Sequence, residues 1–211
     1  MTITIQPDGL HLNPQETLQE LIDEPRLHEF AAGLIPSAVS YLPERFLPKT
    51  LNKTLHLAAP WANPLINALM VLDAEIQTTV KDTARTLPMN TFLEYRESLA
   101  EIPLDSVRLP PLNPDGHYYL VTTDDEDYLA LRLDLHPQRG VMGHVRLAVS
   151  HANRPPTRLL ELEGRLTWQA LSPDLITEVS QLPLPEPLTA SEQTMLTDLL
   201  HQLYKSVTPR S

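Results

Sequence analysis

Hydrophobic positions in the first hundred residues recur at helical spacing. The clearest series is Leu65, Leu69, Leu72, Ile76 and Val80, at intervals of four, three, four and four residues. Side chains at this spacing share one face of a helix. Asn63-Pro64 is typical of a helix start, and polar residues such as Asn67 and Asp73 fall off the apolar face. The pattern predicts a helix over 65–80.

Other parts of this region carry shorter helical signals. Asn13-Pro14-Gln15-Glu16 combines a capping residue, a proline at the first helical position and a glutamate at the third. A further helix is predicted over 91–99, where Thr91 and Glu94 have capping-box spacing. Prolines at 25, 36, 43 and 48 keep the intervening helices short. Residues 1–102 are therefore predicted to be mostly helical.

The periodicity changes after Pro103. Leu129, Leu131 and Leu133 alternate with polar or small residues, which is typical of a strand with two different faces. Three strand-like runs cover 117–122, 128–135 and 143–150, and a fourth run over 158–168 is plausible. Short connections between consecutive strands favour an antiparallel meander of three to four strands.

Helices are predicted again at the end of the chain. Ser172-Pro173 begins a short one, and Thr189 with Glu192 frames a last helix with a leucine-rich stripe. Helices, then strands, then helices indicate an α+β fold, because βαβ units would alternate the two. We expect a helical region over 1–102 and a sheet with C-terminal helices over 103–211, either as two domains or as one merged domain.

Composition narrows the possible functions. The chain has 211 residues with 21 prolines, 6 glycines and no cysteine, which excludes disulfides, thiolate zinc sites and a cysteine nucleophile. No signal peptide or membrane-length apolar run is visible, so we expect a cytoplasmic protein. The formal net charge of −11 disfavours nucleic acid and anionic membranes. The expected partner is another protein, of basic character.

Candidate catalytic chemistry is sparse. Asp124-Asp125-Glu126-Asp127 is a run of carboxylates that suits either a hard cation or a solvated turn between two strands. His117, His136, His144 and His151 lie around the predicted sheet and could converge, but none has the spacing of a zinc-binding helix. Nucleophile-elbow, phosphate-loop and dinucleotide motifs are missing. We therefore predict no catalytic residue, no metal and no cofactor.

Charge is divided unevenly around the predicted sheet. Residues 115–134 hold six acids and one base, Arg132, whereas residues 136–158 hold four arginines and no acid. Adjacent strands of opposite charge could stabilise each other by cross-strand pairing. Alternatively, the two regions could form a bipolar surface that orients a partner.

The segment from Asp115 to Leu171 resembles the C-terminal half of SMI1/KNR4 (SUKH) proteins. The shared order is an acidic turn, a strand beginning Asp127-Tyr128-Leu129, a loop with Pro137 and Gly140, and a strand with Gly143 and Val145. The resemblance covers about a quarter of the chain, and the Asn-Gly-Gly-like turn of the family is missing before Asp115. It implies a non-enzymatic α+β module, and many bacterial members of the family are immunity proteins.

These observations lead to an expected function and two alternatives. The leading expectation is a bacterial non-catalytic protein-binding module, in particular an immunity protein of a toxin–antitoxin system. Its expected contact surface is the set Asp124, Asp125, Glu126, Asp127, Tyr118 and Tyr128. One alternative is a secretion chaperone or adaptor that binds an effector through the helical half. The other is a metal-dependent hydrolase that uses Asp124, Asp125 or Asp127 with His117 or His144.

Overall fold

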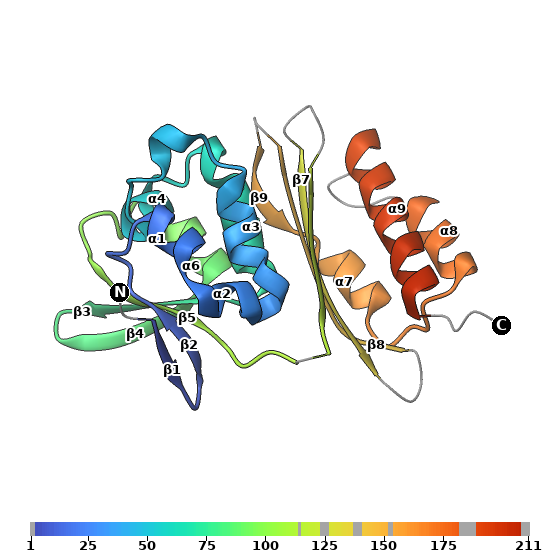
Figure 1. Ribbon diagram of the computed structural model, residues 1–211, viewed down its shortest axis with the longest axis horizontal. Helices are drawn as coiled ribbons and strands as arrows, with labels where there is room; N and C mark the ends of the chain where they lie inside the picture. Colours follow the sequence, from blue (N-terminus) through green and yellow to red (C-terminus); the bar gives the residue numbers. More distant parts are fainter. Residues whose placement is uncertain are drawn as a thin grey trace.

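Two antiparallel sheets organise the protein. The computed structural model describes residues 3–113, 115–122, 127–136, 141–151, 154–181 and 189–207. In Figure 1 the first sheet and its helices lie on the left, the second sheet is seen nearly edge-on, and the last helices lie on the right. The protein is therefore α+β with two antiparallel sheets.

The first sheet occupies the half of the chain that was predicted to be mostly helical, so that prediction is wrong. Its strand order is β1-β2-β5-β3-β4, with every neighbouring pair antiparallel. The strands are β1 (Thr4–Gln6), β2 (Gly9–Leu12), β3 (Glu75–Val80), β4 (Thr83–Pro88) and β5 (Leu104–Leu109). The sheet was missed because most of these strands are short and because β2 is separated from its partner β5 by more than ninety residues.

Short helices fill the long connection between β2 and β3. They are α1 (Leu18–Asp23), α2 (Pro25–Glu29), η1 (Phe30–Gly33), α3 (Leu34–Ser40), η2 (Glu44–Phe46), α4 (Leu51–Leu57), η3 (Pro60–Ala62) and α5 (Asn63–Val71). A capping box formed by Thr17 and Glu20 begins α1. The predicted helix start at Asn13-Pro14 is thus too early. Between β4 and β5, the helix α6 (Met89–Tyr95) begins after Pro88.

The helix predicted over 65–80 is wrong in its second half. The helix α5 ends at Val71, Asp73 takes a left-handed φ of 52°, and β3 begins at Glu75. Ile76 and Val80 are four residues apart, and that spacing places side chains on one face of a strand as well as of a helix. The periodicity alone could not separate the two structures.

The second sheet follows the chain in the order β6-β7-β8-β9. Its strands are β6 (His117–Thr122), β7 (Tyr128–His136), β8 (Val141–His151) and β9 (Arg154–Arg158). The first three coincide with predicted strand-like runs. The run predicted over 158–168 is not a strand, because it contains the end of β9 and the helix α7 (Leu160–Leu166).

Both faces of the second sheet are covered. The helices α7, α8 (Pro173–Gln181) and α9 (Ala190–Val207) cover one face with a leucine-rich core, and α5 packs on the other. The predicted caps of the last two helices are confirmed: Ser172 Oγ accepts from the backbone of Leu175, and Thr189 and Glu192 form reciprocal bonds. Polar residues of β7 and β8 are therefore enclosed between two halves of the chain.

The strand β5 lies after the boundary that was predicted between residues 102 and 103, but it belongs to the first sheet. It pairs with β2 and β3, so the first sheet extends to Leu109. The hydrophobic core around the first sheet also includes Ala130 and Ala148 of the second sheet, so the two sheets share buried contacts. Whether they are two domains or one merged domain stays a prediction. Within the described ranges, every helix is too short or too polar to cross a membrane.

Candidate functional site

The predicted acidic contact surface is only partly described by the structure. Asp124, Asp125 and Glu126 lie outside the described residues. Asp127 is only 2% exposed, its carboxylate lies 3.4 Å from His151 Nε2, and it accepts a hydrogen bond from Thr189 Oγ1 at 3.4 Å. The prediction that Asp127 is exposed for a partner is therefore wrong. Its carboxylate instead connects the start of β7 to the start of α9.

The two predicted contact tyrosines are not brought together. In the ladder between β6 and β7, Tyr118 lies opposite Arg132 and Tyr128 lies opposite Thr122, at the two ends of the pairing. The Tyr118 hydroxyl donates to the carbonyl of Asn113 at 3.1 Å, and burial raises the pKa of this tyrosine. Both rings are half-buried. The three predicted contact residues that the structure describes, Asp127, Tyr118 and Tyr128, thus do not form a single exposed surface.

Two of the residues proposed for a hydrolase, Asp127 and His144, are engaged elsewhere, whereas Asp124 and Asp125 lie outside the described residues. His144 Nε2 lies 3.2 Å from Asp73 Oδ2, whereas Asp127 pairs with His151. Among the described residues, no group of three histidine, aspartate or glutamate side chains is placed to hold a metal ion. The hydrolase alternative therefore has no support in the described part of the chain.

The polar face of α5 packs against the second sheet. Asn63 Nδ2 donates to the carbonyl of His151 at 3.1 Å, and Asn67 Nδ2 donates to the carbonyl of Tyr128 at 3.1 Å and to Ser150 Oγ at 2.8 Å. Asn63 and Asn67 are one helical turn apart and almost fully buried. Asn67 was predicted to fall off the apolar face, and together with Asn63 it forms the contact between α5 and the second sheet.

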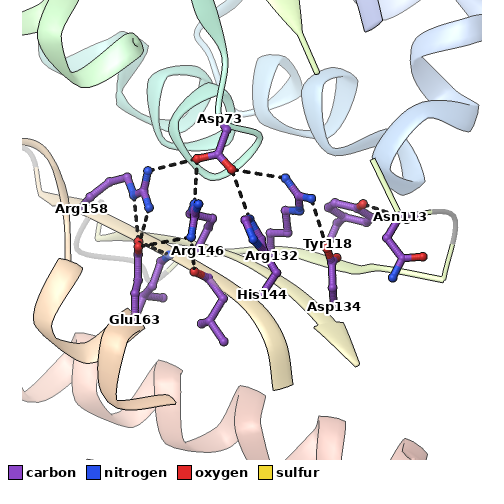
Figure 2. A network of polar contacts seen from close by, with 11 residues as sticks. Asp73, Asn113, Tyr118, Arg132, Asp134, His144, Arg146, Arg158 and Glu163 are labelled. Atoms are coloured by element: carbon purple, nitrogen blue, oxygen red, sulfur yellow. Dashed lines mark hydrogen bonds and ion pairs between the residues drawn. The ribbon is translucent and has the colours of Figure 1, made fainter. Parts of the chain in front are cut away.

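Asp73, just beyond the end of α5, is the centre of a charged cluster (Figure 2). One carboxylate oxygen accepts from Arg146 Nε at 2.7 Å and from Arg158 Nη1 at 3.2 Å. The other accepts from His144 Nε2 at 3.2 Å and from Arg132 Nη1 at 3.4 Å. The four donors come from β7, β8 and β9, so one carboxylate binds three neighbouring strands.

Two further carboxylates complete the Asp73 cluster. Asp134 Oδ2 accepts from Arg132 Nη2 at 3.1 Å, and the Glu163 carboxylate of α7 binds Arg158. Glu163 is 4% exposed and also accepts from the backbone N–H of Leu147 at 2.8 Å. Three carboxylates therefore balance three guanidinium groups, and we infer that the cluster holds the fold together.

The uneven division of charge has a tertiary explanation. Arg132 lies directly opposite Arg146 in the ladder, so the predicted cross-strand pairing of opposite charges does not occur at this position. The arginines are neutralised by Asp73 from the first half of the chain and by Glu163 from α7. The excess of arginine over residues 136–158 was the sequence signal for this cluster. It could not identify the carboxylate partner, because Asp73 is about seventy residues away from Arg146.

Burial and ion pairing act in opposite directions on Asp73. Desolvation raises the pKa of its carboxyl, but hydrogen bonds from His144 and Arg146 and the positive charges of Arg146 and Arg158 lower it to about 2. The carboxylate therefore stays ionised throughout the neutral and mildly acidic range. Because the arginines are already bound, the cluster is a poor site for an additional anion.

The described part of the chain also contains open cavities. One of about 570 Å³ lies between β6 and α9, and Asp198 is the single charged residue among those that line it. Another of about 500 Å³ lies beside β1 and β2 and is lined by Asp8, His11 and Asp105. A third, of about 320 Å³, lies between η1 and β6 and includes Glu29. None of these three cavities is lined by a lysine or arginine.

Comparisons with solved structures give a clear likeness of fold. A Cu,Mo-CO dehydrogenase is similar with a TM-score of 0.72 and 14% identity, over 96% of this chain and 76% of the other. The carbon monoxide dehydrogenase of Hydrogenophaga pseudoflava gives 0.71 and 14%, over 97% and 75%. Quinoline 2-oxidoreductase of Pseudomonas putida 86 gives 0.63 and 12%, over 98% and 75%. No protein-family model and no curated protein matches the sequence.

These likenesses correct two predictions. The matched fold spans both sheets, so the predicted arrangement of a helical half followed by a single meander is wrong. The matched structures are redox enzymes, which contradicts the assignment to immunity proteins and toxin–antitoxin systems. No family match bears on the SMI1/KNR4 resemblance, which stays a prediction.

Proposed function

We propose that this protein is a non-catalytic, protein-binding module of a redox-enzyme assembly. The observation that carries the proposal is the likeness to oxidoreductase chains over nearly the whole length of this chain. One fold can serve many functions, so a chain with the fold of an oxidoreductase domain can take part in such an assembly without carrying out its chemistry. The partner is therefore expected to be another subunit or domain of an oxidoreductase.

The fold family implies FAD as a cofactor, and the described residues do not fit it. FAD carries a pyrophosphate, which proteins hold with glycine-rich backbone or with basic side chains. This chain has six glycines, and no two of them are closer than three positions apart, so the G-x-G spacing of a dinucleotide-binding turn is missing. Of four cavities in the described part, only the one beside α7 and α8 is lined by an arginine, Arg165, and that residue already pairs with Glu161 at 2.7 Å.

Electrostatics supports a basic protein as partner. The internal ion pairs are close to neutral, because the arginines of β7, β8 and β9 are matched by buried carboxylates. The net charge of −11 is therefore left to the remainder of the chain, most of it on the surface. Such a surface attracts a cationic partner over long range and accelerates association at low salt.

Two measurements on purified protein test the proposal. The tagged protein, isolated from its native host, is expected to contain a stoichiometric oxidoreductase subunit or domain, identified by mass spectrometry. In a second measurement, the isolated protein is incubated with excess FAD and then desalted. It is expected to show no flavin absorbance, and any flavin in the native sample is expected to belong to the partner. Stoichiometric FAD on the isolated protein would contradict the non-catalytic assignment, and a partner outside the oxidoreductases would contradict the assembly.

Association with the identified partner should also depend on salt. The association rate is expected to fall as the ionic strength rises, because salt screens the attraction between opposite charges. Stopped-flow or surface-based kinetics at several salt concentrations measures this. A rate that does not change with salt would contradict the electrostatic part of the proposal while leaving the redox partner in place.

A further inference from the structure

A histidine of the first sheet lies on the face opposite to the core and is nevertheless buried. His11 of β2 lies opposite Arg108 of β5 in the ladder, and Ser106 precedes Arg108 by two residues, so it shares that face. Val107, between them, points to the other face and is fully buried in the core. His11 is only 8% exposed, although its own face carries polar side chains. Its neighbours therefore hold the ring in one place.

Both ring nitrogens of His11 have a polar partner. Nε2 lies 3.1 Å from Asp8 Oδ1, and Nδ1 lies 3.1 Å from Ser106 Oγ. An ionised carboxylate can only accept, so Nε2 carries the proton of the neutral ring and donates it to Asp8. Nδ1 is then an acceptor, and the Ser106 hydroxyl donates to it. The order serine, imidazole, carboxylate is the arrangement that activates a serine nucleophile. The two ring nitrogens are exchanged relative to the triad of serine proteases, but each has the partner that its role requires.

The turn between β1 and β2 fixes the position of Asp8. Asp8 is the second residue of this two-residue turn, and Gly9 follows with a φ of 135°. A Cβ at Gly9 would clash with the carbonyl oxygen of Leu109, so the turn requires glycine here. Arg108 Nη1 donates to the carbonyl of Asp8 at 2.9 Å. The hydrogen bond from His11 lowers the pKa of the Asp8 carboxyl, which is therefore ionised at neutral pH.

The three side chains line one cavity of about 500 Å³. A carbonyl compound can therefore reach the Ser106 hydroxyl from solvent. The lining also includes the carboxamides of Gln6, Asn13 and Gln77. Carboxamide N–H groups are donors of the kind that stabilise the oxyanion formed when a hydroxyl attacks a carbonyl carbon. The cavity thus contains a nucleophile, a base and candidate donors for the oxyanion.

The charge of the cavity restricts the compounds that can react there. Asp8 and Asp105 are the carboxylates among the described residues that line it, and no lysine or arginine is among them. Thr79 Oγ1 donates to Asp105 Oδ2 at 2.8 Å and so holds that carboxylate in place. An anionic ester would be repelled by both carboxylates. Small esters that are uncharged or cationic are therefore the expected acyl donors.

We propose that Ser106 is a reactive nucleophile that accepts a small acyl group from an activated ester. The bond from Ser106 Oγ to the carbonyl carbon forms, and the bond from that carbon to the leaving oxygen breaks. His11 takes the serine proton and returns it to the leaving group, so the ring ends neutral. Asp8 is a positioning residue, because it keeps the proton of the ring on Nε2. The product is an acylated form of this chain, so the inference goes beyond the proposed redox assembly and does not depend on it.

Reaction of the full chain with p-nitrophenyl acetate tests the proposal. The wild type is expected to release one equivalent of p-nitrophenol in a burst and to gain one acetyl group, which peptide mass spectrometry should locate on Ser106. Ser106→Ala should lower the burst rate at least roughly 100-fold, because the nucleophile and its base-assisted reaction are lost. Ser98→Ala removes an exposed serine elsewhere and should keep the burst. The anionic p-nitrophenyl hemisuccinate should react more slowly than the acetate.

Variants of the other two residues test their separate roles. His11→Ala should lose the burst, and free imidazole should restore part of it, because the added base can occupy the vacated space. Asp8→Asn should slow the reaction, and Asp8→Glu should recover part of the rate. Circular dichroism checks that each variant is folded. A wild type without a burst, an acetyl group that is found on lysines or persists in Ser106→Ala, or a folded His11→Ala that imidazole does not rescue would overturn the proposal.

Discussion

The two faces of the second sheet are built on different physical principles. The face towards α7, α8 and α9 is apolar, with Leu129, Leu131 and Leu133 of β7 facing the leucines of α9. The face towards α5 carries alanines, arginines and the Asp73 cluster. Apolar packing is non-directional and tolerates changes of shape, whereas a charge cluster requires each partner at its place. One face supplies cohesion, and the other specifies how the two halves of the chain meet.

Removal of apolar volume should have the largest effect. Leu131→Ala is expected to lower the free energy of unfolding by about 3 kcal/mol, because the side chain is fully buried and leaves a cavity. Leu131→Met, which keeps the volume, should cost less than about 1.5 kcal/mol. Urea denaturation of both variants measures the difference. Equal losses for alanine and methionine would show that this face is not held by simple packing.

A change of charge without change of shape should affect the other face almost as strongly. Asp73→Asn is expected to cost about 2 kcal/mol, because it leaves Arg146 and Arg158 without their shared carboxylate. Asparagine accepts a left-handed φ, so the turn itself should persist.

The control for this variant is Asp23→Asn, at an exposed carboxylate that accepts from the side-chain amide of Gln19. It should change the unfolding free energy by less than about 0.5 kcal/mol. If Asp73→Asn were as mild as Asp23→Asn, the cluster would contribute nothing to the contact between the two halves.

Acidic pH should weaken the charged face and leave the apolar face intact. The pKa of Asp73 is lowered from 3.8 to about 2 in the folded protein, so its stabilisation is complete above pH 4 and is lost as the pH falls towards 2. This carboxyl alone should account for about 2 kcal/mol of the loss. Unfolding curves of the wild type and Asp73→Asn at several pH values isolate its share. The unfolding free energies of the two proteins should converge at low pH. If they differed by the same amount at every pH, the ionisation of Asp73 would not be the cause of the acid destabilisation.

Parts of this fold follow directly from local sequence. The strands β6, β7 and β8 coincide with the predicted strand-like runs, of which those of β7 and β8 alternate in polarity, and Thr189 with Glu192 begins α9 as the capping signal indicates. These signals are local, because alternation and capping depend on residues a few positions apart. They predict where the strands of the second sheet lie in the sequence, but they do not predict which elements cover each face of that sheet.

Other parts could not be read in this way. Ile76 and Val80 fit a helix and a strand equally well, and only the pairing of β3 with β4 and β5 selects the strand. Arg158 begins a run that resembles a strand, but the residues after it form α7, whose Glu163 binds that same arginine. In the first case contacts with distant strands override a weak local preference, and in the second the helix is also held by the bond from the backbone N–H of Leu147 to Glu163.

The sequence by itself determined that one side of β7 and β8 is apolar and the other polar, since side chains alternate across a strand. Only the tertiary structure decided that the polar side is enclosed, because α5 and the turn after it bring Asn63, Asn67 and Asp73 to it from about seventy to ninety residues away. A polar pattern normally indicates solvent, but buried polar groups are equally stable when each finds a partner of opposite charge or a hydrogen bond. That choice of partner depends on the fold, and no local pattern records it.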